Sequence, residues 1–493
     1  MFTYSEFKYD DTKSVCPYEE PISREDTVKV NGQDVPVYTC RISKYPFNRV
    51  WPGEQRPANQ TELASFVNLV SDEEITLEVT VNRSYEKIMI KPYSKGIEFS
   101  DENGKITFTL KNNGHYVLEA DSYHHCLYIF NSKPAERPKE SDVTYYFGAG
   151  IHMVGKITLK DHDRVYVDKD ALVFGCIYAE NAKNIRIFGN GILDDTAEGR
   201  IDTYGHEQFT NGNVKFFDCE ALRIEGVLLR NSAIWCVNIF HCTDVVLDDI
   251  KVFGQWRYNT DGVDIVNSRD ITVKNSFIHS FDDTVTIKGI DRYIDTDNEN
   301  ILIENCELWC DWGRACEIGI ETACRRYRNI VFRNCDVLRA GGVALDIQNG
   351  DFAEISDILF ENIHVEYNSF DTPELYQKTD DMTYNVENEI AIPYLISISN
   401  ARWRTAKNHE LLGIPMEYPE GTNTEGIECG GVHDITYRNI TVYYDEKMPK
   451  RDGAFNIPVR TLTCVEGVRY YHLTVENVRV RWLGELYPLE LSL

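Results

Sequence analysis

A short phrase of alternating apolar and polar residues recurs along the chain from residue 185 onward. Its first copy reads Ile-Arg-Ile-Phe-Gly from Ile185, and its last reads Leu-Thr-Val-Glu-Asn from Leu473. Because successive side chains of a strand point to opposite faces, a period of two residues is typical of β-strands. The copies begin at Ile185, Leu222, Val245, Ile271, Ile301, Ile330, Ile358, Ile435 and Leu473.

The fifth residue of each phrase is of a type that tolerates a bend in the backbone. It is Asn or Gly in eight copies and Asp249 in the ninth. These residue types adopt left-handed backbone angles most readily. Several neighbouring copies start only 23–30 residues apart. A strand, a tight bend and another strand at such a period predict a parallel β-solenoid.

In such a solenoid the coils stack about 4.8 Å apart, so equivalent residues form ladders. We therefore expect Ile271, Ile301 and Ile330 to stack inside the coils. Cys306 and Cys335 fall at the same place in successive coils, which predicts stacked core thiols. A leucine-rich repeat, the competing solenoid, would need Leu-rich phrases and helical segments, and the sequence shows neither.

Residues 1–140 lack the phrase and show short alternating strands instead. Asn31-Gly32 and Asn103-Gly104 lie between such strands and are typical hairpin turns. The pattern predicts an antiparallel β-sandwich domain over 1–140, followed by the solenoid domain over 141–493. The polar stretch 131–141 is the expected linker.

The step between the phrases at Ile358 and Ile435 is much longer than the others. We interpret it as an insertion over about 366–430, rich in prolines and acids. Long loops on a solenoid commonly shape a binding groove or a subunit contact. A homo-oligomer formed through this insertion is therefore a hypothesis.

Composition excludes several classes of protein. Apolar residues make up 42% of the 493 residues and charged residues 26%, as in folded soluble domains. No run of 18 apolar residues exists, so no transmembrane helix and no membrane partner are expected. With 51 basic and 79 acidic residues the net charge is −28, and this charge disfavours nucleic acid as a partner.

The N-terminal residues Met1–Glu6 lack the basic and apolar regions of a secretion signal, so we expect a cytoplasmic protein. The fourteen cysteines do not form the dense framework of a small secreted fold and are interpreted as reduced thiols. A zinc site would have to use four clustered cysteines, and their spacing lacks the Cys-x2-Cys pairs typical of zinc sites, so no metal is predicted. These four are Cys306, Cys310, Cys316 and Cys324. No organic cofactor is predicted either.

One segment of the solenoid is rich in acids. Asp261 precedes the pair Asp282-Asp283 by 21 residues, which is close to one coil. The three carboxylates should therefore lie on neighbouring coils, where their repulsion raises at least one pKa. Hydrolysis of a glycosidic bond needs this combination of a protonated acid and an ionised base. Solvated turn acids and a calcium site are the alternatives.

These residues resemble right-handed β-helix glycoside hydrolases of family 28, the polygalacturonases, and family 49, which includes dextranase and isopullulanase. Asn259-Thr260-Asp261 and Asp282-Asp283 resemble the catalytic motifs of family 28. The segments 230–235 and 189–194 resemble two further motifs, and the likeness covers about Phe147 to Leu345. The sandwich in front of the helix is more like family 49.

The resemblance implies a right-handed parallel β-helix and an inverting glycoside hydrolase. Asp282 would be the general acid, and Asp261 and Asp283 would hold and deprotonate the attacking water. Attack from the opposite face of the sugar gives inversion.

Two departures from the family 28 pattern bear on the substrate. Arg314 stands where that pattern has a histidine, and Asp346 and Gln348 stand where it has cations that hold a uronate carboxylate. An Asp facing the cleft would repel a uronate, so we predict a neutral glycan such as an α-glucan. A polygalacturonase-like enzyme acting on uronate oligosaccharides, and a non-catalytic carbohydrate- or calcium-binding β-helix, remain the alternatives.

The candidate substrate-binding residues surround the three aspartates in the predicted fold. Arg314 either contacts substrate or forms a structural ion pair with Glu317 or Asp311. Each nearby tryptophan either stacks on a sugar ring or packs in the core. The binding candidates are Asn259, Arg314, Glu317, Asp346, Gln348, Trp256 and Trp312, and Trp235 and Trp309 are the other tryptophans considered.

Overall fold

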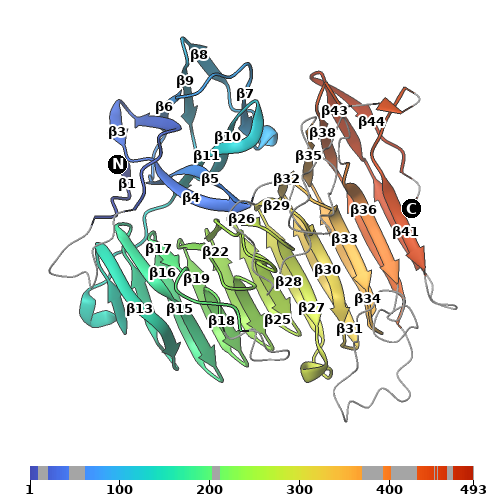
Figure 1. The fold of residues 1–493 in the computed structure, drawn as a ribbon. Helices are drawn as coiled ribbons and strands as arrows, with labels where there is room; N and C mark the ends of the chain where they lie inside the picture. Colours follow the sequence, from blue (N-terminus) through green and yellow to red (C-terminus); the bar gives the residue numbers. More distant parts are fainter. Residues whose placement is uncertain are drawn as a thin grey trace, which may run out of the picture.

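The computed structural model describes residues 1–8, 20–43, 61–201, 211–368, 392–400, 430–448, 450–451, 453–463, 470–491 and 493. Apart from three short 3-10 helices, η3 (Tyr93–Lys95), η4 (Glu140–Asp142) and η6 (Asp291–Tyr293), the secondary structure of these residues is β-strand. A two-layered N-terminal part lies above a long row of stacked strands (Figure 1).

The N-terminal part is a β-sandwich. Its pairings are antiparallel except that β5 and β11 run parallel. The first sheet contains β1 (Thr3–Tyr4), β4 (Tyr38–Ser43), β5 (Thr61–Val70), β7 (Ile88–Lys91), β10 (Gly114–Ala120) and β11 (Ser122–Ser132). The second contains β2 (Asp26–Val30), β3 (Gln33–Val35), β6 (Ile75–Val81), β8 (Phe99–Glu102) and β9 (Lys105–Leu110).

Both predicted Asn-Gly turns are hairpin turns. Asn31 and Gly32 join β2 to β3 with φ of 50° and 79°, and Asn103 and Gly104 join β8 to β9 with φ of 57° and 80°. Two consecutive positive φ angles match the twist of the flanking strands.

The rest of the described chain forms the predicted parallel β-helix, whose strands lie in three ladders. The recurring phrase occupies the first ladder, which forms one 11-stranded sheet. Its strands are β12 (Tyr145–Phe147), β14 (Arg164–Val167), β16 (Lys183–Gly189), β19 (Glu220–Glu225), β22 (Thr243–Asp248), β25 (Arg269–Lys274), β28 (Asn298–Glu304), β31 (Arg326–Arg333), β34 (Glu354–Glu361), β37 (Val432–Arg438) and β42 (Tyr470–Glu476).

The other two ladders are joined in a single 20-stranded sheet. The second ladder runs through β13 (Gly150–Leu159), β15 (Ala171–Glu180), β18 (Val214–Phe217), β21 (Val237–Phe240), β24 (Val263–Val266), β27 (Val285–Gly289), β30 (Arg314–Thr322), β33 (Val343–Asn349), β36 (Tyr394–Asn400) and β41 (Val459–Thr463). The third runs through β17 (Ile192–Asp194), β20 (Leu228–Arg230), β23 (Lys251–Val252), β26 (Phe277–Ser280), β29 (Glu307–Cys310), β32 (Asp336–Arg339), β35 (His364–Tyr367), β38 (Thr441–Tyr444) and β43 (Arg479–Trp482). Two pairings here are antiparallel: β44 (Glu485–Pro488) pairs with β43, and β39 (Lys450–Arg451) pairs with β40 (Ala454–Phe455) in a sheet of its own.

The bend after the first ladder is built as the sequence predicts. All nine bend residues have positive φ, from 52° at Asn275 to 137° at Gly189. The amides also form a ladder, in which Asn305 donates to Asn275 at 3.3 Å and Asn362 donates to Asn334 at 3.0 Å. Left-handed backbone and stacked amides therefore fix the same corner of successive coils.

The interior of the coils is a continuous apolar core. Ile271 pairs with Ile301, which pairs with Ile330, and all three are buried. Cys306 and Cys335 are buried free thiols at equivalent positions, as predicted. Since each coil adds another layer of apolar side chains, the core is continuous from coil to coil.

The sandwich packs directly on the third ladder. Side chains of β11 alternate, so Leu127 and Ile129 face the interior of the sandwich while Phe130 faces the helix. The Phe130 ring lies 5.3 Å from the ring of Phe277 of β26. A buried Lys91 crosses the same interface, with its ammonium 3.2 Å from a carboxylate oxygen of Glu366. Apolar packing and a buried ion pair therefore join the two parts.

The expected insertion over 366–430 needs correction. Residues 366 and 367 belong to β35, and β36 is a regular strand that pairs with β33 and β41. Residues 394–400 alternate apolar and polar positions, which is typical of a strand. The predicted insertion wrongly included them as part of a loop. The remaining residues, 369–391 and 401–429, lie outside the described residues, as does most of the oligomer contact predicted there.

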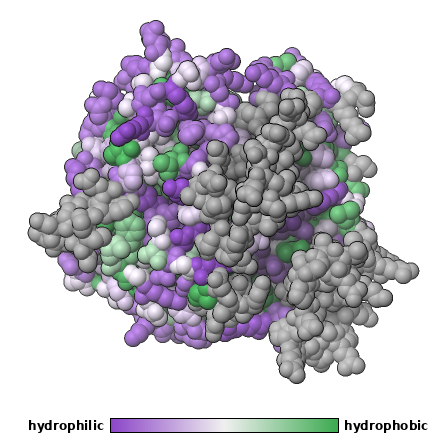
Figure 2. Space-filling model, viewed as in Figure 1, coloured by the Kyte–Doolittle hydropathy of each residue, from purple (hydrophilic) through white to green (hydrophobic). Residues whose placement is uncertain are grey.

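The coloured part of the face drawn in Figure 2 is mostly polar. On the face drawn in Figure 2, hydrophilic residues dominate the coloured area and apolar residues are scattered among them. Scattered apolar residues are normal on a protein surface and mark no interface. Within the described ranges the structure contains no apolar helix of the length needed to span a bilayer.

Candidate active site

The three aspartates lie in two stacked turns that lead into the second ladder. Val263 of β24 pairs with Val285 of β27, which places Asp261 opposite Asp283. The backbone N–H of Gly262 donates to the carbonyl of Asp283 at 2.8 Å. This is the stacked arrangement that the 21-residue spacing predicts. Asp261, Asp282 and Asp283 are 2%, 6% and 6% exposed.

Asp282 has the environment of a general acid. Burial and, next to it, the neighbouring Asp283 carboxylate raise the pKa of Asp282 to about 7. Its Oδ2 accepts a hydrogen bond from Nδ2 of Asn259 at 3.1 Å, and Asn259 in turn accepts one from Arg200 at 3.1 Å. The structure therefore holds a carboxyl group that keeps its proton near neutral pH.

Asp283 has the opposite electrostatics. Burial alone would raise the pKa of Asp283, but Lys288 and Arg314 hold it below its ordinary value. The Lys288 ammonium lies 3.3 Å from Asp283 Oδ2, and the Arg314 backbone N–H donates to Asp283 Oδ1 at 3.1 Å. Adjacent carboxyl groups with divergent pKa values suit an acid and a base.

Asp261, which was expected to hold and deprotonate the water together with Asp283, has a different environment from Asp283. Burial, Asp264 and Asp282 raise the pKa of Asp261 well above its ordinary value. Its Oδ2 lies 3.8 Å from the Lys288 ammonium, farther than that of Asp283. Of the trio, Asp283 therefore has the environment that most favours ionisation.

Arg314 joins the candidate base to three other predicted binding residues. Its Nη1 lies 3.6 Å from Asp283 Oδ1, and its Nε lies 3.8 Å from Glu317 and 3.5 Å from Asp346. Gln348 donates to Glu317 at 3.0 Å and to Asp346 at 2.9 Å. Of the two structural partners considered for Arg314, Glu317 is the one found, whereas Asp311 pairs with His279 at 3.1 Å.

One expectation about this cluster is wrong. Asp346 was expected to face an open cleft, but it is 0% exposed and contacts Arg314 and Gln348. It therefore acts as a buried counter-charge, because the strand turns this side chain toward the arginine of the neighbouring coil.

The tryptophans divide into core and surface residues. Trp309 is 1% exposed and donates to Asp311, and Trp235 is 8% exposed in a cluster with Phe240. Both are buried, and the Trp235 ring also lies 4.9 Å from the ammonium of Lys288. Trp312 is half-buried, packs 5.6 Å from Phe281 and directly precedes Gly313 in the site.

Trp256 lies to one side, where its Nε1 donates to Asn231 at 3.1 Å. The guanidinium of Arg41, from the sandwich, lies 5.8 Å from the Trp256 ring centre. Trp312 is the candidate sugar platform whose contacts link it to the aspartate turn, because it packs on Phe281, which directly precedes Asp282.

The sequence interpretation missed three residues of the site. Lys288 is buried between carboxylates, Glu321 lies 3.6 Å from its ammonium, and Gly313 lies against the aspartate pair. The alternation of side chains along β27 could have identified Lys288 from the sequence. Val285 and Ile287 face the core, so Lys288 must face outward, on the side that carries the aspartates.

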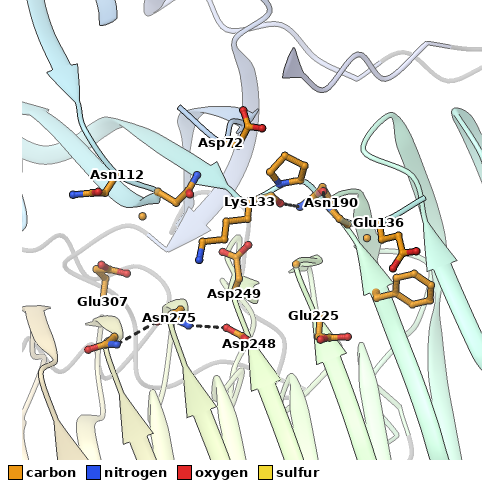
Figure 3. A pocket seen from close by; sticks show the side chains of 18 of the residues that line it. Asp72, Asn112, Lys133, Glu136, Asn190, Glu225, Asp248, Asp249, Asn275 and Glu307 are labelled. Atoms are coloured by element: carbon orange, nitrogen blue, oxygen red, sulfur yellow. Dashed lines mark hydrogen bonds between the residues drawn. The ribbon is translucent and has the colours of Figure 1, made fainter. Parts of the chain in front are cut away.

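A pocket of about 740 Å³ lies elsewhere, between the sandwich and the asparagine ladder (Figure 3). Lys133 reaches into it from the linker, and Asn275 on its floor donates to Asp248. None of the three aspartates lines it. Among the acids that line this pocket, Glu307 pairs with Lys95 at 2.5 Å. This is an ion pair, unlike the adjacent carboxyl groups of Asp282 and Asp283.

In the part of the chain that the structure describes, no group of three or more His, Cys, Asp or Glu side chains is arranged to hold a metal ion. The eleven described cysteines are buried and free. The zinc and calcium interpretations therefore gain no support from geometry.

Comparison with known proteins agrees with the site. Residues 139–379 match the model of Glycosyl hydrolases family 28, a range that contains all three aspartates and their contacts. The chain is 21% identical over 236 residues to a protein described as "Probable rhamnogalacturonase A" from Aspergillus oryzae, covering 45% of this chain and 47% of that protein. It is 25% identical over 189 residues to an "Exopolygalacturonase" from Cochliobolus carbonum, covering 36% and 40%.

The chain thus spans about half the length of the curated relatives it matches. Among solved structures, Dex49A from Penicillium minioluteum superposes with a TM-score of 0.56 at 13% identity, covering 90% of this chain and 92% of that one. This likeness extends over both domains and establishes the fold. The resemblance to right-handed β-helix glycoside hydrolases of families 28 and 49 is confirmed.

Proposed function

We propose that this chain is an inverting glycoside hydrolase that uses Asp282 as general acid and Asp283 as general base. The observation that carries the proposal is the pair of adjacent carboxyl groups whose pKa values are shifted in opposite directions. Turn acids exposed to solvent would not show this difference, because water would screen both groups alike.

The proposed reaction needs no further group. Asp282 gives its proton to the glycosidic oxygen as the bond to the anomeric carbon breaks. A water molecule attacks that carbon from the opposite face, and Asp283 takes its proton. Asp261 hydrogen-bonds this water and orients it. The two protons then exchange with solvent, which restores the starting state.

The cations of the site support a neutral substrate, for which an α-glucan is one example. Lys288 and Arg314 are each already shared among several carboxyl groups. A uronate carboxylate would have to compete with these groups for the same two cations. The carboxyl groups are Asp261, Asp264, Asp282, Asp283, Glu317, Glu321 and Asp346.

A uronate-containing substrate is the second candidate. The two relatives named above are described as a probable rhamnogalacturonase and an exopolygalacturonase. The side chain of Arg314 is 32% exposed, so part of its guanidinium is open to a carboxylate. A bidentate pair there would hold one uronate.

Hydrolysis of neutral and galacturonate oligosaccharides, compared by kcat/KM at two salt concentrations, tests both candidates. We expect faster cleavage of a neutral oligosaccharide and little change with salt. Faster cleavage of galacturonate oligomers would favour the second candidate. Time-resolved NMR of the first product anomer tests the mechanism, because retention is incompatible with direct attack by water.

A further inference from the structure

Lys288 is a buried ammonium group surrounded by carboxylates. Its side chain is 4% exposed, and its Nζ lies 3.3 Å from Asp283, 3.6 Å from Glu321 and 3.8 Å from Asp261. It also lies 4.9 Å from the centre of the Trp235 ring. A buried lysine is costly unless it is paired, so this arrangement fixes the position of the ammonium.

The same geometry distinguishes the two stacked aspartates. Lys288 is closer to Asp283 than to Asp261, and Arg314 adds a backbone hydrogen bond and its guanidinium to Asp283 alone. Asp261 keeps one oxygen, Oδ1, without a hydrogen-bond partner among the described residues. Asp283 thus contacts two cationic groups, whereas Asp261 contacts one of them at a longer distance.

We propose that Lys288 is a positioning residue that selects Asp283, rather than Asp261, as the base of the trio. The proposal rests on the proposed function and names a residue that acts through Asp283 without touching the substrate. The ammonium stabilises the ionised form of Asp283, while Asp261 and Asp282 stay protonated. Asp283 then accepts the proton of the water, Asp261 hydrogen-bonds that water, and Asp282 gives its proton to the glycosidic oxygen.

Glu321 adjusts this selection because it competes for the same ammonium. Burial alone would lower the pKa of Lys288, but Glu321, Asp283 and Asp261 raise it, so the ammonium stays charged. Removing the negative charge of Glu321 would let Lys288 stabilise the ionised form of Asp283 more strongly. The titratable and charged groups around Lys288 are Asp261 and Asp264 at β24, Asp282 and Asp283 at β27, Arg314, Glu317 and Glu321 on β30, Asp346 on β33 and Lys215 on β18.

Two substitutions should move the pH profile in opposite directions. In Lys288→Met the pKa of Asp283 rises, so the acidic limb of kcat should shift to higher pH by about 1–3 units. In Glu321→Gln the pKa of Asp283 falls further, so the limb should shift to lower pH. Lys251→Met is the matched control, because Lys251 is equally buried but contacts Asp249 and Ser132 instead of the site.

The test measures kcat and KM against pH for the three variants and the native chain, with thermal unfolding as a check on folding. It also measures the carboxyl titration of Asp283 by NMR of labelled aspartate, assigned with Asp283→Asn. A folded Lys288→Met variant whose acidic limb does not move overturns the proposal while hydrolysis itself stands. If Lys288→Met does not fold, the direction of the Glu321→Gln shift decides.

The titration also separates this proposal from the proposed function. If the native chain cleaves none of the oligosaccharides, the proposed function fails, and the Asp283 titration alone decides about Lys288. An Asp283 pKa that is the same in Lys288→Met and in the native chain then overturns the selection, and a raised pKa supports it.

Discussion

Gly313 allows a direct test of the carboxylate geometry. A methyl group placed on its Cα would lie 2.3 Å from Asp283 Oδ1 and 2.6 Å from Asp282 Oδ1, whereas ordinary contacts are 3.4–4 Å. In Gly313→Ala both carboxyl groups must therefore move by about 1 Å. A displacement of that size in a reacting group costs about 10² in rate, or ~2.7 kcal/mol in activation free energy.

The assay compares kcat and the melting temperature of Gly313→Ala with those of Gly199→Ala. A methyl group on Gly199 would meet no atom within 4 Å, so this control should keep native activity. Overpacking at Gly313 should also cost about 1–3 kcal/mol of stability, so rates are measured well below the melting transition. A folded Gly313→Ala variant with more than half of the native kcat would refute the proposal that these two carboxyl groups must keep their positions.

Three further outcomes follow from the same structure. Asp282→Asn should lower turnover by about 10²–10⁴ with no loss of melting temperature, because it removes the proton donor and a like-charge contact; more than half of the native activity would exclude Asp282 as the acid. The rate should fall as pH rises through about 7, since the acid must be protonated, and stay high toward low pH until Asp283 is protonated below its ordinary range; an initial-rate profile that is flat above 7 would contradict this. Asn305→Ala should lower the free energy of unfolding by about 1–3 kcal/mol, because it removes a ladder hydrogen bond and strains a backbone φ of 54°; Asn305→Gly, which tolerates that angle, should lose less, and equal losses in thermal unfolding would contradict the strain argument.

The helix could be predicted because its constraints are local and repeated. Alternation places Ile271, Ile301 and Ile330 inside, and each bend needs a residue that accepts positive φ. Each coil has the same pattern of core and bend residues as the coil before it, so the spacing of the recurring phrase predicts which residues of neighbouring coils stack. The strand β36 was missed because it lies between long segments of other composition, where no regular spacing points to it.

The site could be predicted only in part. The spacing of Asp261 and Asp283 by about one coil brings them together without knowledge of side chains. The role of each carboxyl group depends on neighbours from several coils, such as Lys288 and Arg314, and on the burial of all of them. Distances of 3.3 and 3.8 Å from one ammonium distinguish Asp283 from Asp261, and no sequence pattern contains that difference.

The two departures from the family 28 pattern form one network. Arg314 stands in place of the expected histidine and Asp346 in place of an expected cation, and the structure pairs them at 3.5 Å. Burial raises the pKa of Asp346, and Arg314 opposes that shift. Arg314→Ala alone would leave Asp346 and Glu317 without this counter-charge, so a loss of galacturonate cleavage in that variant could reflect instability. The double variant Arg314→Ala/Asp346→Asn removes the guanidinium and the buried Asp346 carboxyl group together. A selective loss of galacturonate cleavage that persists in this double variant would therefore assign Arg314 to the substrate.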